Sequence, residues 1–254
     1  MSDDILAERT GNILSIQLNR PAKKNAMTSS MYVAMAKLLD VANADDQVRV
    51  VLWHAAGGSF SAGNDIEDFI KNPPGQGESP QAELIRALID FEKPLVAAVQ
   101  GAAIGGGTTM LAHCDFVYAA ENAKFQLPFV NLALVPEFGS SYLLPLRFGY
   151  LRAAELFLLG RSFDAARAAQ LGLVTQVVSE QSLLATATET ARALAEKPAA
   201  AVQAGKRLLK RAAREQLEQA VKFEAQTFAE RVRSDEAKKA FAAFLDRRQP
   251  AQHS

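Results

Sequence analysis

The sequence contains a single cysteine, Cys114, among 254 residues. A lone thiol excludes an internal disulfide and is typical of a reducing compartment. The net charge of the chain is zero, because 28 Lys and Arg residues balance 28 Asp and Glu residues. This balance argues against a general binder of nucleic acid or of membrane surfaces. Neither His54 nor His253 fits a metal-ligand spacing, so we expect no metal site.

The sequence also has little that could cross a membrane. The uncharged segment between Lys93 and Asp115 has about the length of a membrane span. Its glycines and polar residues make a buried core segment the better interpretation. The N-terminus, M-S-D-D-I-L, is acidic and lacks the apolar core of a signal peptide. We therefore expect a soluble, cytoplasmic protein without a membrane partner.

Strand patterns alternate with helix patterns along the chain and then give way to helix alone. Strands are expected at residues 5–18 (a hairpin), 48–53, 95–99, 116–119 and 172–178. Helices are expected at 28–42, 81–91, 142–148, 150–159, 165–171 and from 182 onward, with a break at Lys197-Pro198. Residues 71–80, which hold three prolines, are expected to form a loop or lid. This order predicts an α/β core domain, residues 1–197, followed by a C-terminal helical region, 198–254.

Residues 93–115 organise the rest of the chain. An apolar run at 95–99 predicts a buried strand, Gly101 and then Gly105 to Gly107 predict a tight turn, and residues 110–114 show helical spacing. Glycine lets a ligand approach the backbone because it has no Cβ. The first N–H groups of the following helix would have no intrahelical acceptor and would suit a developing negative charge.

The glycines allow several interpretations. A phosphate-binding P-loop requires a lysine after the second glycine, but Gly106 is followed by Gly107 and Thr108. The spacing is also wrong for a dinucleotide-binding fingerprint. Close packing of helix on strand and an oxyanion hole both remain possible.

A second glycine-rich loop and one isolated glutamate complete the candidate site. Residues 57–65 place Asn64 between Gly63 and the acidic start of a short predicted helix. Farther along, residues 134–141 are mainly apolar, with Glu137 between Pro136 and Phe138. A glutamate in a loop is usually exposed to solvent, so this apolar setting is unusual.

Several motifs occur in one order along the chain. They are N-R-P-A-K-K-N-A-M at 19–27, F-S-A-G-N-D at 60–65, G-A-A-I-G-G-G at 101–107, C-D at 114–115, A-K-F at 123–125, A-A-Q-L-G-L-V at 168–174 and F-A-A-F-L-D-R-R at 241–248. Together they resemble the crotonase family, the enoyl-CoA hydratase/isomerase superfamily, over nearly the whole chain. The resemblance implies a spiral of ββα units with a C-terminal helical trimerisation region. It also implies acyl-CoA substrates, with CoA as part of the substrate and no separate cofactor.

The resemblance assigns residues to the site. The backbone N–H groups of Asn64 and Gly106 would form an oxyanion hole for the thioester. Lys23 and Lys24 would lie near the CoA nucleotide, although a solvated basic loop is an equal alternative. The full set expected to contact substrate is Lys23, Lys24, Ala26, Ala62, Gly63, Asp65, Ile66, Gly105, Phe129 and Phe138. For Asp65, a simpler role is a favourable charge in the first turn of a helix.

The resemblance also indicates which reaction of the family to expect. Hydratases of the family use two glutamates, at positions where this chain has Thr109 and Phe129. Glu137 instead matches the catalytic base of the peroxisomal-type Δ3,Δ2-enoyl-CoA isomerase branch. We therefore expect an isomerase. The alternatives are another crotonase reaction, such as hydration or thioester hydrolysis, and a non-catalytic acyl-CoA-binding protein.

The C-terminal region suggests self-association. Its apolar residues need a surface to cover, and the family resemblance points to a homotrimer or a dimer of trimers. The residues concerned are Phe223, Phe228, Phe241, Phe244 and Leu245.

Overall fold

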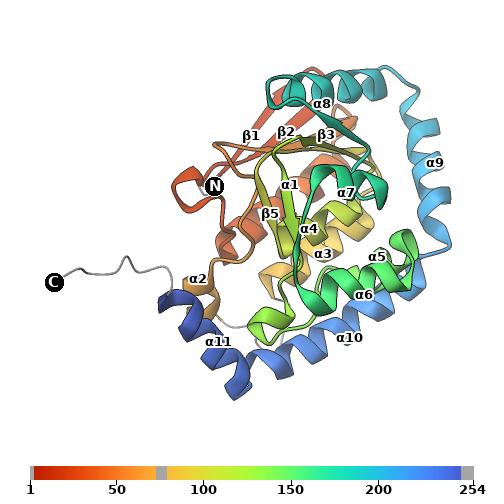
Figure 1. The fold of residues 1–254 in the computed structure, drawn as a ribbon. Helices are drawn as coiled ribbons and strands as arrows, with labels where there is room; N and C mark the ends of the chain where they lie inside the picture. The colour runs from red at the N-terminus through yellow and green to blue at the C-terminus, as the bar shows by residue number, and fades with distance from the viewer. Residues whose placement is uncertain (1–2, 73–78, 247–254) are drawn as a thin grey trace.

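The computed structural model describes residues 3–72 and 79–246 (Figure 1). Most of the loop expected at 71–80, and the end of the motif at 241–248, lie outside these residues. The strands are β1 Ile5–Thr10, β2 Ile13–Leu18, β3 Val50–Ala55, β4 Leu95–Val99, β5 Ala102–Ile104, β6 Phe116–Ala120, β7 Lys124–Gln126, β8 Ser162–Asp164 and β9 Gln176–Val178. The helices are η1 Pro21–Lys23, α1 Ser29–Ala44, α2 Ile66–Lys71, α3 Pro80–Asp90, α4 Gly106–Thr109, η2 Met110–His113, η3 Val130–Leu132, α5 Ser140–Phe148, α6 Tyr150–Leu159, α7 Ala165–Gln170, α8 Glu180–Ala195, α9 Ala199–Arg211, α10 Arg214–Val232 and α11 Asp235–Asp246.

The larger sheet has the strand order β1-β2-β3-β4-β6-β9. The predicted hairpin β1–β2 is antiparallel, whereas the remaining neighbours are parallel. Side chains alternate between its two faces, as a pleated strand requires. Val51 and Trp53 of β3 enter the main core with the apolar face of α1, while Val50 and Leu52 pack toward α8. Burial on both faces explains why these strands are continuous apolar runs.

A smaller sheet, in the order β5-β7-β8, corrects the expected path of the glycine-rich segment. The prediction was strand, turn, helix, but a three-residue strand, β5, follows Gly101 and pairs in parallel with β7. The helix beyond is also short, because α4 is followed at once by a 3-10 turn, η2. Strands of three residues are too short to show a period, so β5, β7 and β8 gave no sequence signal.

The C-terminal helices pack back onto their own chain. The break between α8 and α9 falls at Lys197-Pro198, as predicted. Phe228 of α10 and Phe241 of α11 lie edge-on to Phe69 of α2, with ring centroids 5.8 and 5.9 Å away. These two aromatic side chains therefore need no second subunit to cover them, whereas Phe223 remains 69% exposed. Within the described part of the chain, no helix combines the length and the apolar character required to span a bilayer.

Helix α9 is fixed to the core by a buried lysine. Lys206 donates hydrogen bonds of 2.7 Å to the Asp115 carboxylate and to the Lys93 carbonyl oxygen. The same carboxylate accepts from the Leu95 amide at the start of β4. The ion pair thus connects the C-terminal region to the central strand.

We predict that Lys206→Ala lowers the free energy of unfolding by about 3 kcal/mol, because it leaves a partly buried carboxylate without its cation. The neighbouring Arg207→Ala is the matched control. Arg207 pairs with Glu92 at the surface, and exposed pairs contribute about 0–1 kcal/mol. Urea unfolding of both variants measures the difference. Equal, small losses would show that this pair does not anchor α9.

Candidate active site

The two glycine-rich loops meet at the edge of the smaller sheet. The Ser61 amide donates to the Ala102 carbonyl oxygen, and the Ile104 amide donates to the Ser61 carbonyl oxygen, both at 2.9 Å. A Cβ atom on Gly63 would lie 2.8 Å from the Ile104 carbonyl oxygen, and one on Gly107 would lie 2.9 Å from the Ser61 Cβ. These glycines are required for close packing of backbone on backbone. The Gly63 Cβ atom would also lie 4.0 Å from the Gly105 Cα atom, so the residues that precede Asn64 and Gly106 approach each other closely.

The Asn64 and Gly106 amides are available as donors. Gly105 has a φ of 53°, a left-handed value that redirects the chain into α4. The Thr108 and Thr109 amides both donate to the Gly105 carbonyl oxygen. By contrast, neither the Asn64 nor the Gly106 amide has an acceptor among the residues that the structure describes. The close-packing and oxyanion-hole interpretations of the glycines are thus compatible.

Glu137 faces this point from a third segment. It lies just before α5, is only 8% exposed, and its Oε1 atom has no hydrogen-bond partner within residues 3–72 and 79–246. A Cβ atom on Gly106 would lie 3.0 Å from Oε1, so the carboxylate lies directly against this glycine. Burial, and then the charge of Glu224, raise the pKa of Glu137 to about 8, while the Asn64 side chain opposes the shift.

Tyr32 belongs to the same cluster, and the sequence analysis did not identify it. Its hydroxyl donates to the Asn64 Oδ1 atom at 2.6 Å, and the ring is fully buried in α1. Burial, followed by the charge of Glu137, raises the pKa of Tyr32 and keeps the hydroxyl protonated. Its place one residue after Met31, in the helix expected at 28–42, was the available signal. Burying a phenol usually requires a partner for its hydroxyl.

The adjacent residues His113 and Cys114 are both buried. His113 donates from Nε2 to the Phe138 carbonyl oxygen at 2.7 Å, so it supports the segment that carries Glu137. Burial lowers the pKa of His113 to about 3 and leaves the ring neutral at ordinary pH. Burial also raises the pKa of the Cys114 thiol to about 12. The pair is therefore no nucleophile and base.

An apolar cavity of about 130 Å³ opens beside Glu137. It lies between α2, α3 and α10, and Glu224 is the second carboxylate on its wall. Phe138, expected at the substrate, contributes to it, whereas Phe129 is buried against Phe157. The apolar part of the wall consists of Phe69, Ala82, Ile85, Phe138, Val221, Ala225, Phe228 and Ala229.

The loop that carries Lys23 and Lys24 is built on a fixed base. The Asn25 side chain donates to the carbonyl oxygens of Ala56 and Ser59, and it accepts from the Arg20 amide. Both lysines are exposed, and the Lys24 carbonyl oxygen accepts from the Ala62 amide at 2.9 Å. The loop thus borders Asn64 and its neighbours, while the lysine side chains remain in solvent.

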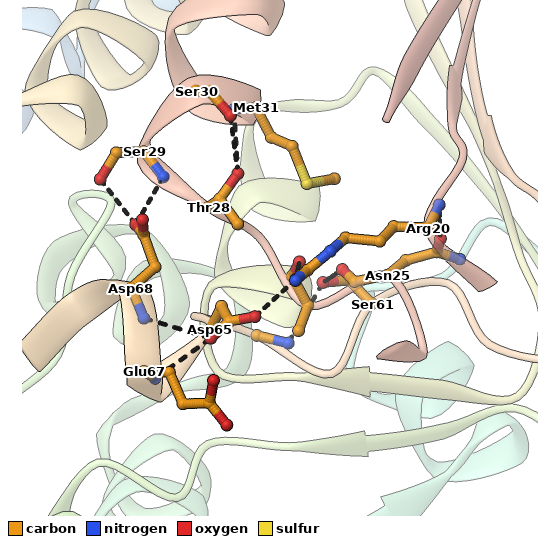
Figure 2. A network of polar contacts seen from close by, with 12 residues as sticks. Arg20, Asn25, Thr28, Ser29, Ser30, Met31, Ser61, Asp65, Glu67 and Asp68 are labelled. Atoms are coloured by element: carbon orange, nitrogen blue, oxygen red, sulfur yellow. Dashed lines mark hydrogen bonds and ion pairs between the residues drawn. The ribbon is translucent and has the colours of Figure 1, made fainter. Parts of the chain in front are cut away.

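The Asp65 side chain has structural roles at the start of α2 (Figure 2). It caps α2 through the amides of Glu67 and Asp68, and it pairs with Arg20 at 2.5 Å. Burial alone would raise the pKa of Asp65, but the Arg20 contact and the cap bonds lower it. Asp68 accepts in turn from the backbone and hydroxyl of Ser29. The geometry therefore favours the capping role for Asp65.

The remaining residues expected at the substrate lie around these loops. Ala26 and Ile66 are buried and Ala62 is half-buried. Met27 connects the segment that carries Ala26 to the segment that carries Ala62 and Ile66. Its amide donates to the Gly63 carbonyl oxygen, and its carbonyl oxygen accepts from the Asp65 amide. The Thr109 side chain is buried, with its hydroxyl turned to the Gly105 carbonyl oxygen at 3.3 Å.

Comparison with known proteins identifies the family of this chain. The family model for enoyl-CoA hydratase/isomerase matches residues 8–254. The chain is 35% identical to rat (Rattus norvegicus) enoyl-CoA delta isomerase 2, covering 97% of this chain and 64% of the relative. It is also 35% identical to an enoyl-CoA hydratase of Mycobacterium tuberculosis, covering 97% and 95%.

A solved structure shows the same fold. The crystal structure of an enoyl-CoA hydratase/isomerase from Pseudoalteromonas atlantica superposes with a TM-score of 0.92 at 40% identity, covering 99% of this chain and all of the other. The predicted crotonase fold is thereby confirmed. With nearly the whole chain matched in sequence and in structure, this protein is a member of the enoyl-CoA hydratase/isomerase family.

Proposed function

We propose that the protein is a Δ3,Δ2-enoyl-CoA isomerase that converts 3-enoyl-CoA to trans-2-enoyl-CoA. The observation that carries the proposal is the position of Glu137. This buried carboxylate has an oxygen without a hydrogen-bond partner in the described structure, and that oxygen lies against Gly106. A base in this position can reach a substrate whose thioester oxygen is held by the nearby amides.

The proposed reaction is a proton transfer between two carbons. The thioester carbonyl oxygen accepts hydrogen bonds from the amides of Asn64 and Gly106. Glu137 removes a proton from C2, and the electron pair moves into a dienolate whose negative charge rests on that oxygen. Donors already aimed at a developing charge stabilise such a transition state. Protonated Glu137 then returns the proton at C4, so the double bond moves without any redox cofactor.

The environment of Glu137 suits this work. A base that must accept and then release a proton is most effective when its pKa lies near the working pH. Burial and the charge of Glu224 bring the pKa of Glu137 to about 8. The apolar cavity beside it supplies the desolvation and could accept an acyl chain.

Hydration is the main alternative, since the family relatives include hydratases as well as isomerases. Holding and activating water requires carboxylates, and the expected positions carry Thr109 and Phe129. Phe129 is packed against another aromatic ring, and the Thr109 hydroxyl faces a backbone carbonyl. Non-catalytic acyl-CoA binding is a weaker alternative, because it does not explain why a carboxylate is buried with an oxygen that has no partner in the described structure. Thioester hydrolysis would also use a base, and release of free CoA distinguishes it from isomerisation.

The first prediction concerns the base itself. Glu137→Gln keeps the shape of the side chain but removes the proton acceptor, so isomerisation of trans-3-hexenoyl-CoA should slow by at least about 10²-fold. Glu137→Asp should retain more activity but misplace the carboxylate. Turnover is followed by coupling to an added hydratase and dehydrogenase, with binding measured by calorimetry. A Gln variant that binds and reacts like the parent would remove Glu137 from the mechanism.

The second prediction is that hydration of crotonyl-CoA is slow compared with isomerisation. General acid–base groups each supply about 10²–10⁴-fold, and both water-activating carboxylates are replaced here. Loss of absorbance of the conjugated thioester measures the rate. Hydration as fast as isomerisation would mean that a different residue activates water, and the proposed reaction would be wrong.

Assembly into a homotrimer or a dimer of trimers is also proposed. The exposed apolar residues of the C-terminal region include Leu208 at 70% and Leu209 at 87% on α9, and Phe223 at 69% on α10. Burying a leucine side chain between subunits would stabilise the assembly by about 1.5–3 kcal/mol.

We therefore predict that Leu208→Ser combined with Leu209→Ser reduces the mass measured by light scattering at micromolar concentration. Leu184→Ser, at an exposed leucine of α8, is the control and should leave the mass unchanged. The intact protein should have three or six times the mass of one chain. A single-chain mass for the intact protein would exclude the proposed assembly.

A further inference from the structure

The turn that carries Glu137 has an unfavourable backbone. Phe138 has a φ of 63° and Gly139 a φ of 67°, so two consecutive residues adopt left-handed values. Glycine tolerates this conformation, but a bulky residue such as phenylalanine does so only when its surroundings hold it. The direction of the Glu137 side chain depends on this turn, because Glu137 immediately precedes it.

A second buried carboxylate holds the turn. Glu224 of α10 accepts from the Gly139 amide through Oε2 and from the Ser141 amide through Oε1, both at 2.7 Å. Both oxygens are therefore used on one turn, and the side chain is only 7% exposed. From the other side, His113 binds the Phe138 carbonyl oxygen at 2.7 Å.

Helix α10 places Glu224 where an apolar residue would be expected. Its buried positions are Leu217, Glu224, Phe228 and Val232, a helical stripe in which the glutamate is the one charged member. Leu217 also packs on the turn, since a Cβ atom on Gly139 would lie 2.2 Å from its Cδ1 atom. A buried carboxylate is costly unless hydrogen bonds compensate it. Burial raises the pKa of Glu224, and the hydrogen bonds from Ser141 and Gly139 reduce this shift without cancelling it.

The negative charge of Glu224 also affects the pKa of Glu137. The two side chains line one cavity, and the charge of Glu224 contributes to the raised pKa of Glu137. The other titratable group facing Glu137 is Tyr32 of α1, which burial keeps protonated. His113 of η2 lies behind the turn and is neutral at ordinary pH. Glu224 is therefore the charged group that affects the base most directly.

We propose that Glu224 is a positioning residue for Glu137. Its carboxylate fixes the turn at Phe138 and Gly139 so that Glu137 faces Gly106, and its charge increases the proton affinity of that base. This inference rests on the proposed function, since it gives Glu224 its role through the base of the isomerase.

Two variants separate geometry from charge. Glu224→Gln removes the charge and leaves only one oxygen to accept from two amides, so one buried N–H loses its partner. Glu224→Asp keeps the charge but is one methylene shorter, so it should not reach both amides. Glu218→Gln is the matched control, because Glu218 is an exposed glutamate of the same helix that pairs with Arg214.

In both Glu224 variants, kcat for trans-3-hexenoyl-CoA should fall by about 10- to 100-fold, as expected for a displaced base. KM should change less than kcat. In the parent, kcat/KM should rise with pH and level off above about 8, because Glu137 acts in its ionised form. This rising limb of the kcat/KM profile should move to lower pH in Glu224→Gln, because that variant lacks the like charge. It should stay at the parent's pH in Glu224→Asp. Glu218→Gln should match the parent throughout.

A second measurement does not require isomerisation. Butyryl-CoA has C2 protons but no double bond, so exchange of those protons in D₂O, measured by mass spectrometry, reports the base and the oxyanion donors alone. If the parent exchanges the C2 protons of butyryl-CoA but does not isomerise 3-enoyl-CoA, the proposed function is refuted. The exchange rates of the variants would then still test the role of Glu224. Slower exchange in both variants, with the pH limb displaced only in Gln, supports the inference.

Other outcomes overturn it. If the parent isomerises and Glu224→Gln has the parent's kcat and pH limb, Glu224 does not position the base. A rate loss in Glu224→Gln without any displacement of the limb would indicate a structural role only. If the Gln variant does not fold, Glu224→Asp decides the question, because parent-like kcat in that variant would contradict the geometric requirement. A parent that neither isomerises nor exchanges C2 protons excludes Glu137 as a base and the inference with it.

Discussion

The close approach of two glycine-rich loops is the constraint on which the site depends. Ser61 forms two backbone hydrogen bonds with β5, and side chains at Gly63 or Gly107 would prevent this close approach. Gly101 is equally restricted, because its Cβ atom would lie 1.9 Å from the Gly58 carbonyl oxygen. We propose that this approach brings the amides of Asn64 and Gly106 to one substrate oxygen, although they belong to separate loops. Since both donors are backbone groups, the fold itself determines their position.

The Glu137 carboxylate, which lies opposite these donors, is kept out of water. Burying this carboxylate costs free energy that a surface glutamate would not lose, and the like charge of Glu224 adds to the cost of ionising it. Neighbouring groups nevertheless fix its position. Tyr32 holds the Asn64 side chain from α1, while Glu224 and His113 hold the turn from α10 and η2. Groups from the first helix and from the C-terminal region therefore converge on Glu137. The C-terminal helices thus contribute to the site as well as to the core.

Much of this architecture could be predicted from the sequence, for identifiable reasons. Long apolar runs and capped helices gave β3, β4, α1 and α3, and the order of motifs indicated the family. The short strands β5, β7 and β8 could not be predicted, because pairing between distant segments defines them. Its apolar neighbours and the family resemblance singled out Glu137, whose role stays a prediction, whereas nothing singled out Glu224. Its place in the stripe Leu217, Phe228 and Val232 was visible, but the amides that compensate it lie some eighty residues earlier.

The division between isomerase and hydratase chemistry follows from the same geometry. Relatives named as an isomerase and as a hydratase are equally similar to this chain, so overall similarity does not decide between the two reactions. We propose that the side-chain carboxylate facing the amides of Asn64 and Gly106 decides it. Water addition requires carboxylates that hold a water molecule, and Thr109 and Phe129 offer none. A single glutamate from the turn before α5, in an apolar pocket, is suited to carrying one proton between two carbons of the same bound chain.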